Sequence, residues 1–396
     1  MADFICPICG NKDPNSIGVF KGKPYCRRCI SFKGEEANKS IVIPKEANAD
    51  LSYELSYEQK VLSWKLIENY KQKVDTLVYA VCGSGKTEIC LGVISYAIEQ
   101  GLRVGFAVPR RSVCVELGIR FKNIFKGNCV VVIYGGHHRK LTGDIVCLTT
   151  HQLFRYENYF DLLIMDEIDA FPYKGNDVLE KMFYRSIKGN YVLLTATPTA
   201  QLIKEYQKSG KALLKLFARF HHHFLPVPKI VIGNDIKIHY KLITILKDFI
   251  NKGKQVFIFV PTIDLSIKIA MLLKPFFRKG TYINSKVKSQ ERIIEDFKNK
   301  KYLYLVTTAV LERGVTIKDL QVIIYRADNA IYDSSSLIQI SGRVGRKKDA
   351  PDGEVIFLAK KKTEHMERAV SEINAANKSL QNMLRKRKNK RLLQTF

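Results

Sequence analysis

The sequence lacks the features of a membrane-spanning or secreted protein. No stretch approaches the roughly 18 uncharged apolar residues that a transmembrane helix requires. The first residues also lack the charged and then apolar pattern of a secretory signal peptide. We therefore expect a cytoplasmic location, with contact to the inner face of a membrane only through partner proteins.

Acidic residues are scarce relative to basic ones. The chain has 38 Asp and Glu against 65 Lys and Arg, which gives a net charge of +27 over 396 residues. A charge of this size indicates a polyanionic partner, and nucleic acid is the expected one. A basic surface that only keeps the protein in solution is the alternative. Part of the charge is concentrated in residues 360–396, where 11 Lys and Arg stand against 3 Glu.

Cysteine is concentrated in one segment of the chain. Four of the nine cysteines form two CxxC pairs separated by sixteen residues, namely Cys6, Cys9, Cys26 and Cys29. Two such pairs are typical of a zinc ribbon, because each tight turn presents two thiolates and four thiolates complete a tetrahedron around Zn²⁺. Redox pairs are the alternative, but no thioredoxin-like strand and helix surround either motif. The other five cysteines stand singly in apolar settings and are expected to be reduced core residues.

A glycine-bearing turn follows an expected strand at residues 77–79 and precedes an expected helix from Glu88. This order is typical of a phosphate-binding loop, in which backbone N–H groups and a helix N-terminus surround a phosphate. Lys86 is expected to reach the β- and γ-phosphates of ATP, and Thr87 to bind Mg²⁺. The strict pattern has glycine where this chain has Ala80, so the assignment depends on partners further along the chain. The predicted loop residues are Ala80, Val81, Cys82, Gly83, Ser84, Gly85, Lys86 and Thr87.

Short apolar strands and helical stretches alternate after this loop. Such strands imply a parallel sheet covered on both faces, whose ligands bind beyond the carboxyl ends of the strands. Asp166 and Glu167 directly follow the expected strand at residues 162–165. Asp166 is expected to hold Mg²⁺ and Glu167 to polarise the attacking water. Two acids that only cap a helix N-terminus are the alternative.

The run from Gln339 to Arg346 is the second strong pattern, and it lies in a later α/β half of the chain. Arg343 and Arg346 are three residues apart, so on a helix they would share a face. Their guanidinium groups can stabilise the charge on a transferring γ-phosphate. If they belong to a second unit, ATP is expected between the units, and hydrolysis would open and close a cleft. A plain phosphate or surface site is the alternative.

Together these motifs resemble those of superfamily 2 helicases and translocases, and the resemblance covers nearly the whole chain. Alanine is common at the first glycine position of the loop in that superfamily. The matching stretches are 80–87 (motif I), 109–111 (Ia), 166–169 (II), 195–197 (III), 307–308 with 312–315 (V) and 339–346 (VI). A narrower resemblance is to the ComFA family, the late-competence ATPases of Gram-positive bacteria, over residues 80–88, 134–136, 149–153 and 166–172.

This resemblance implies the fold class, α/β with two tandem RecA-like parallel-sheet domains behind a small N-terminal four-cysteine zinc module. The predicted boundaries are residues 1–34 for the zinc module, 35–50 for a linker, 51–216 for the first RecA-like domain, 217–232 for a second linker, 233–359 for the second domain and 360–396 for a basic C-terminal helix and tail. Three adjacent histidines in the second linker, His221, His222 and His223, cannot readily share one metal ion. We expect them to form a basic linker contact or to have no role.

The resemblance also implies an activity, partners and residue roles. The activity is ATP-driven translocation of single-stranded DNA during natural transformation, with ATP, Mg²⁺ and Zn²⁺ as cofactors. The partners are single-stranded DNA, a ComFC-type protein and, further, a recombination mediator and the membrane DNA-uptake channel. The implied residues are Gln59 at the adenine edge, Gly314 at the nucleotide, Gln339 in catalysis, Arg110, Gly135, Thr149, Thr307 and Thr308 at DNA, and Thr195 and Thr197 in coupling the two sites.

Two other functions stay open at this point. A primosomal-type or other superfamily 2 helicase would separate strands of DNA or RNA, although no obvious wedge insertion interrupts the sequence. A zinc-dependent DNA-binding adaptor with a vestigial ATPase would not need intact hydrolytic residues, whereas Lys86, Asp166 and Arg343 are all present. Direction of movement and oligomeric state do not follow from the sequence.

Overall fold

The computed structural model describes residues 4–393, apart from residues 40, 138 and 309–316, and describes side chains as far as Arg385. The chain forms two compact units. Unit 1 contains residues 1–80 and 85–216, and unit 2 contains residues 81–84 and 217–396. Among the described residues, no helix combines the length and the apolar composition that crossing a bilayer requires.

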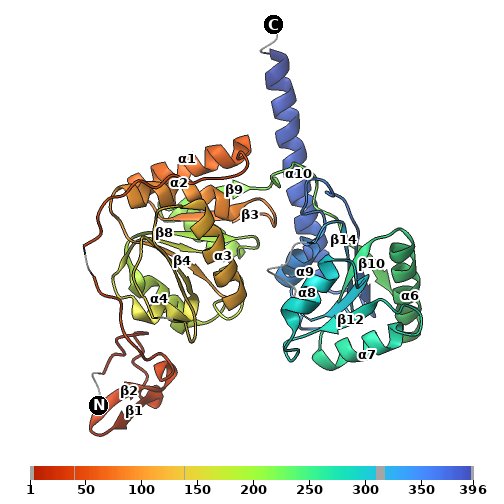
Figure 1. Cartoon of the computed structure of the whole chain (residues 1–396), viewed down its shortest axis with the longest axis horizontal. Coiled ribbons are helices and arrows are strands. Elements are labelled where there is room, and N and C mark those ends of the chain that lie inside the picture. The colour runs from red at the N-terminus through yellow and green to blue at the C-terminus, as the bar shows by residue number, and fades with distance from the viewer. Residues whose placement is uncertain (1–3, 40, 138, 309–316, 394–396) are drawn as a thin grey trace. The chain divides into compact units, whose positions relative to one another are not determined.

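Unit 1 is built around a seven-stranded parallel sheet, as the apolar strand pattern predicted (Figure 1). In spatial order its strands are β5 (Val130–Ile133), β6 (Ile145–Thr149), β4 (Val104–Val108), β7 (Phe160–Met165), β8 (Ile187–Thr195), β3 (Thr76–Ala80) and β9 (Ala212–Leu216). Because every pairing is parallel, the carboxyl ends of all these strands meet at one edge of the sheet.

Helices cover both faces of this sheet, so its central strands are buried along their whole length. Two helices, α2 and α3, pack on one face, and α4, the 3₁₀ segment η3 and α5 cover the other. The helical segments of the unit are α1 (Tyr57–Lys71), α2 (Lys86–Glu99), α3 (Arg111–Ile124), η3 (Thr150–Arg155), α4 (Asp177–Ser186) and α5 (Ala200–Lys208). The expected three-layer α/β arrangement is therefore confirmed for this unit.

The four-cysteine module packs against the same unit. It contains η1 (Pro14–Ser16), the antiparallel hairpin β1 (Ile17–Phe20) and β2 (Lys23–Cys26), and η2 (Arg27–Cys29). Its cysteines join the apolar cluster of α4 and η3. Arg28 forms an ion pair with Asp177 at the start of α4. The ring of Phe32 stacks on His151 with a centroid distance of 6.1 Å, so the connection after the hairpin is anchored as well.

Unit 2 contains a six-stranded parallel sheet. Its order is β10 (Lys229–Ile232), β15 (Val355–Ala359), β14 (Leu320–Tyr325), β11 (Gln255–Phe259), β13 (Tyr304–Thr307) and β12 (Gly280–Ile283). Its helices are α6 (Asp235–Asn251), α7 (Ile263–Leu273), α8 (Gln290–Lys298), α9 (Ser334–Ser341) and α10 (Glu364–Leu393). Strand β10 lies inside the range that the sequence predicted as a linker.

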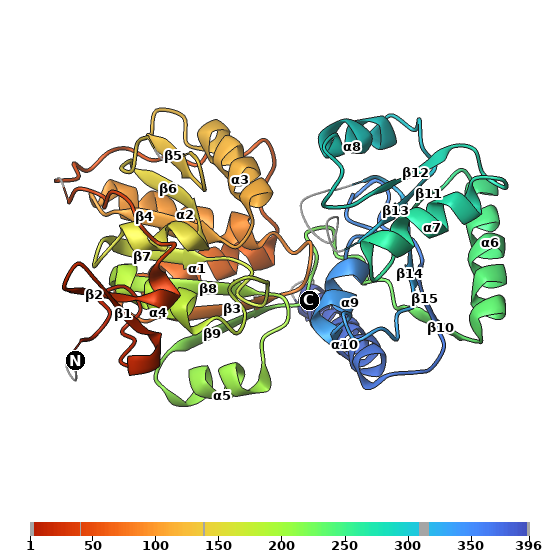
Figure 2. The same cartoon turned by 90° about the horizontal axis from the view of Figure 1, so that it is seen from below.

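Alternation along the strands divides the core of unit 2 into two layers. Val256 and Ile258 of β11 face α6 and α7, whereas Phe257 and Phe259 face α8, α9 and the first half of α10. Figures 1 and 2 show α6 and α7 on one side of this sheet and α9 and α10 on the other. The predicted closing amphipathic helix from Glu364 is confirmed as α10.

Candidate active site

The predicted phosphate loop connects β3 to α2, as expected. Gly83 and Gly85 both have φ of +79°, a left-handed conformation that glycine adopts without strain. Lys86 is the first residue of α2, so the loop ends at the N-terminus of a 14-residue helix. Unpaired N–H groups and the helix dipole favour a phosphate at this position. The backbone therefore fits the phosphates of a nucleotide.

Gln59 lies next to this loop. Its Oε1 accepts a hydrogen bond from the N–H of Ser56 at 2.8 Å, and its own N–H donates to the Ser56 hydroxyl at 3.3 Å. This capping box begins α1 and fixes the side chain. The Gln59 amide nitrogen lies 2.2 Å from where a Cβ on Gly85 would be. Gln59, the residue predicted to contact adenine, therefore lies at the loop. Any residue larger than glycine at position 85 would displace the Gln59 side chain.

Asp166 and Glu167 occupy the predicted place at the carboxyl end of β7. The Asp166 N–H continues the sheet by donating to the Ala107 carbonyl at 3.0 Å, and Asp166 Oδ1 accepts from the Glu167 N–H at 2.8 Å. Glu167 has φ of +58°, a strained conformation for a residue with a side chain. Only β8 separates β7 from β3, so the acids and the phosphate loop leave the sheet about 10 Å apart. The Asp166 carboxylate and the Thr87 hydroxyl extend from these two strand ends, and both are oxygen ligands of the kind that Mg²⁺ on a bound triphosphate takes.

Asp169 connects this acidic turn to the end of β8. Its two carboxylate oxygens accept from the Thr195 hydroxyl at 2.9 Å and the Thr197 hydroxyl at 2.8 Å. The Thr197 N–H also donates to the Thr195 hydroxyl at 3.0 Å. The two threonines predicted to couple ATP and DNA are therefore bonded to the loop that follows the Asp166–Glu167 pair.

We expect Thr197→Ala to weaken this coupling. The variant removes one donor to Asp169, so basal ATPase should stay within a few-fold of the wild type, while stimulation by single-stranded DNA falls roughly tenfold. Thr199→Ala is the matched control, because that hydroxyl caps α5 and does not contact Asp169. Unchanged stimulation in Thr197→Ala would contradict a coupling role.

Sequence reasoning missed a second connection to the phosphate loop. The Tyr53 hydroxyl donates to Glu88 at 2.8 Å and accepts from Arg120 at 3.1 Å. Arg120 also forms an ion pair with Glu88, which directly follows Thr87. Burial raises the pKa of Tyr53, so the hydroxyl stays protonated. These residues are more than 30 positions apart in sequence, so no local pattern could have joined them.

Three predicted DNA contacts lie along one edge of unit 1. Arg110 follows β4, Gly135 follows β5 and Thr149 ends β6, and these three strands are neighbours in the sheet. Arg110 is the N-cap residue of α3. Thr149 is only 6% exposed, so it offers little surface to a bound strand.

One of the predicted DNA contacts of unit 2 is less accessible than a DNA-binding role requires. Thr307 is fully buried, and its hydroxyl donates to the Thr308 carbonyl at 3.1 Å. Thr308 is partly exposed and stays a predicted DNA contact. Gly314 and residues 312–315 lie outside the described residues. For this unit, the prediction of a backbone contact therefore depends on Thr308.

A cavity of about 340 Å³ lies at the carboxyl ends of β11 and β14 in unit 2. It adjoins the N-terminus of α7, whose N-cap is Thr262. A helix N-terminus with nearby cationic side chains favours a phosphate. Its lining residues are Pro261, Thr262, Asp264, Leu265, Lys268, Arg326 and Asn329. None of them belongs to a motif used in the sequence prediction.

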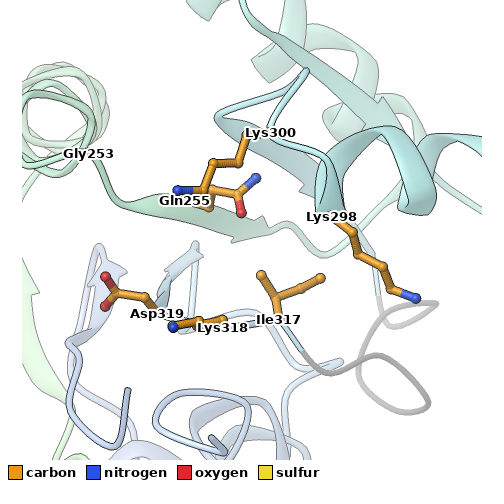
Figure 3. Close-up of a pocket in the computed structure, with 7 residues that line it drawn as sticks. All are labelled: Gly253, Gln255, Lys298, Lys300, Ile317, Lys318 and Asp319. Carbon is orange, nitrogen blue, oxygen red and sulfur yellow. The ribbon is translucent and has the colours of Figure 1, made fainter. Parts of the chain in front are cut away.

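A second cavity of about 340 Å³ lies at the opposite edge of the same sheet (Figure 3). It contains Lys298, Lys300 and Lys318, but the amino end of Lys298 points away from the other labelled side chains. Lys318 is paired with Asp349 at 2.6 Å. Lys298 also ends α8, where a cation is expected because of the helix dipole. This cavity therefore has no convergent anion site.

In unit 2 the predicted arginines, Arg343 and Arg346, both follow the end of α9. Gln339 is in the helix and 6% exposed, and Arg343 is 2% exposed. Arg346 is partly exposed, and its Nε donates to the Gly342 carbonyl at 2.9 Å. The helix ends at Ser341, so the expected shared helical face is wrong. A tight turn holds Arg343 and Arg346 instead.

The four N-terminal cysteines come together as predicted. Their Sγ atoms lie within 4.8 Å of one another, and all four residues are buried. The Sγ atoms of Cys9 and Cys26 are 3.8 Å apart, which is about the edge of a tetrahedron with Zn–S bonds of about 2.3 Å. In the first knuckle, the Gly10 N–H donates to the Cys6 carbonyl at 2.8 Å. The donor set and its dimensions fit a structural zinc ion.

Comparison with known proteins agrees with this arrangement. The DEAD/DEAH box helicase family matches residues 62–206, and the helicase conserved C-terminal domain matches residues 241–348. Competence protein ComFA of Bacillus subtilis is 33% identical over 94% of this chain and 86% of its own length. Competence protein ComFA of Streptococcus pneumoniae is 32% identical over 90% of this chain and 86% of its own length.

More distant similarities concern parts of the chain or its fold. Replication restart protein PriA of Helicobacter pylori is 28% identical over 47% of this chain and 32% of its own length. The structure of S. cerevisiae Dbp5 bound to RNA and ADP BeF3 superposes with a TM-score of 0.58 at 15% identity, over 82% of this chain and 92% of that chain. The latter similarity establishes the fold alone.

Proposed function

Since the chain belongs to the ComFA family of competence proteins and has both domains of an ATP-hydrolysing superfamily 2 helicase, we propose that it is a motor on single-stranded DNA. It would use ATP to pull incoming DNA into the cytoplasm during natural transformation. The hydrogen bonds of Thr195 and Thr197 to Asp169 carry this proposal. They join the end of a sheet strand to the loop behind the predicted hydrolytic acids, as a motor that couples two sites requires.

The proposed hydrolysis uses residues of both units. Lys86 and the loop N–H groups would hold the phosphates, and Thr87 and Asp166 would hold Mg²⁺, which when bound would supply positive charge to the phosphate oxygens. Glu167 orients and polarises the attacking water. Gln339, Arg343 and Arg346 act on the transferring phosphoryl group, where the arginines stabilise its charge. Gln59 contacts the adenine edge.

We propose that the residues predicted to contact DNA bind its sugar-phosphate backbone and not its bases. Arg110, Gly135 and Thr149 lie at one sheet edge of unit 1, and Thr308 lies at the end of β13 in unit 2. Contacts to phosphates carry no sequence information, which suits a motor that must move along any DNA. The net charge of +27 supports strong, salt-dependent binding.

The proposed partners follow from membership in the family. They are a ComFC-type protein, a recombination mediator that receives the incoming strand, and the membrane channel that delivers it. The protein would then work at the inner face of the membrane, held there by these partners. A zinc ion in the four-cysteine module would complete the fold of residues 1–34.

Steady-state ATPase measurements at fixed salt test the proposed function. We expect strong stimulation by single-stranded DNA, and little by duplex DNA or single-stranded RNA. Equal stimulation by RNA or duplex would favour a general helicase instead. Tight DNA binding without stimulation, also in the presence of the ComFC-type partner, would favour a DNA-binding adaptor.

A further inference from the structure

Arg219 is a fully buried arginine in the segment that leads into unit 2. Arg219 is 1% exposed to solvent, and its side chain is among the largest buried ones in the described residues. Its Nη1 donates to the carbonyl oxygens of Val344 at 2.8 Å and Gly345 at 2.7 Å. Its Nη2 donates to the Gly342 carbonyl at 3.3 Å. One guanidinium therefore contacts three carbonyls of the turn that carries Arg343 and Arg346, while its Nε donates to the Cys82 carbonyl of the predicted phosphate loop at 3.3 Å.

Burial of this charge is costly without compensation. Within the described residues, no carboxylate forms an ion pair with Arg219, so carbonyl dipoles are its acceptors. Burial and then the nearby charge of Arg346 lower the pKa of Arg219 to about 10, which still leaves it protonated at neutral pH. The site thus keeps two cationic side chains close together, an arrangement that an anionic ligand would relieve.

The turn itself has little freedom to find another arrangement. Gly345 has φ of +66°, and a Cβ at this position would lie 2.0 Å from the Pro351 carbonyl oxygen. The His221 Nδ1 accepts from the His223 N–H at 3.2 Å, so its Nε2 carries the proton and donates to the Gly345 carbonyl at 3.0 Å. Two side chains from the 217–232 segment therefore hold the same backbone.

These carbonyls follow the C-terminus of α9, where helix geometry leaves acceptors without partners. A planar guanidinium with several donors in fixed directions can set the orientation of each peptide group. Arg343 lies between two of the three carbonyls that Arg219 binds, and Arg346 directly follows the third. Movement of these peptide groups would move both arginines.

We propose that Arg219 is a positioning residue for ATP hydrolysis, which acts by fixing the turn of Arg343 and Arg346. This inference rests on the proposed role of those two arginines. An anchor for the linker is the simpler explanation, but the linker has a separate anchor. Asn377 of α10 accepts from the Leu225 N–H at 2.7 Å and donates to the Leu225 carbonyl at 2.9 Å.

The test compares Arg219→Met and Arg219→Lys with the wild type in basal and DNA-stimulated ATPase assays. We expect Arg219→Met to lower kcat at least tenfold, with KM for ATP within about twofold, because a misplaced arginine affects the transition state more than binding. Arg219→Lys keeps the charge but loses the planar fork, so kcat should fall less. Lys229→Met is the matched control, since Lys229 is an exposed residue of the same segment whose one ion pair within the described residues is with Glu354.

Hydrogen exchange keeps the inference testable if Arg219→Met folds poorly. In Arg219→Lys, the amides of residues 342–344 should exchange faster, while those around Leu225 keep wild-type rates. Wild-type kcat in both variants would overturn the inference. So would a loss of rate that matches a loss of folded protein, or faster exchange confined to the linker.

Failure of the proposed function would look different. A wild-type protein that single-stranded DNA does not stimulate would contradict the motor, yet the basal ATPase would still report on Arg219. Conversely, normal DNA stimulation with unchanged kcat in both variants would leave the motor intact and remove only the role of Arg219.

Discussion

Lys86→Ala is expected to lower ATP hydrolysis by roughly 100-fold or more, while binding of single-stranded DNA persists. In the proposed site Lys86 would place a positive charge at the phosphates of ATP, and preorganised charges of this kind contribute about 3–4 kcal/mol to a transition state. Lys86 is the first residue of α2 and forms no ion pair among the described residues. Its removal should therefore leave the fold unchanged. ATPase rate and fluorescence anisotropy of labelled DNA at one salt concentration measure both outcomes.

The control for this variant is another lysine of unit 1. Lys204 of α5 is exposed and has no ion pair among the described residues. Lys204→Ala changes the net charge equally and should keep the full ATPase rate. If Lys86→Ala hydrolyses ATP at the wild-type rate, the assignment of the phosphate loop is wrong.

The second large effect is expected from loss of the metal site. Cys26→Ser combined with Cys29→Ser removes two of four ligands, so zinc should be released and residues 4–34 should unfold. Structural zinc contributes on the order of 10 kcal/mol to such small modules, and the short hairpin β1–β2 has little other core. Metal analysis and limited proteolysis of the N-terminal segment report the two results.

The same variant should affect DNA stimulation more than basal hydrolysis. Phe32 stacks on His151, two residues after the predicted DNA contact Thr149. Loss of the module removes this support, so the half-saturating concentration of single-stranded DNA should rise. Among the described residues, the phosphate loop does not contact the module, so the basal ATPase rate should stay unchanged. Cys129→Ser is the control, because Cys129 lies outside the cluster and its variant should retain zinc. One equivalent of zinc still bound in the double variant would contradict the ligand set.

The parts of the site that could be predicted are short and continuous in sequence. The phosphate loop, the Asp166–Glu167 pair and the CxxC turns each place their groups within a few residues, so one turn or one strand end fixes their geometry. The central strands were also predictable, because burial on both faces produces an uninterrupted apolar run. Family profiles and the two similar ComFA proteins confirm the overall assignment.

The parts that could not be predicted depend on distant or weakly patterned segments. Strand β10 has only four residues, none of them buried, and its short apolar run follows Pro226 and Pro228, so it was assigned to a linker. Arg219 finds its carbonyl partners more than 120 residues away, and a lone arginine between apolar residues has no local pattern. The buried position of Thr307 likewise follows from packing in unit 2, since Thr-Thr after a strand suggests exposed hydroxyls.

The anchoring of the 217–232 segment limits how far the chain can extend between the units. Strand β9 ends at Leu216, and Arg219 is already bonded within unit 2. The three intervening residue steps span at most about 11 Å. A tether this short gives each unit an effective concentration near the other in the millimolar range or above. If the proposed hydrolysis needs residues of both units, a severed unit 2 added at micromolar concentration would therefore restore it poorly.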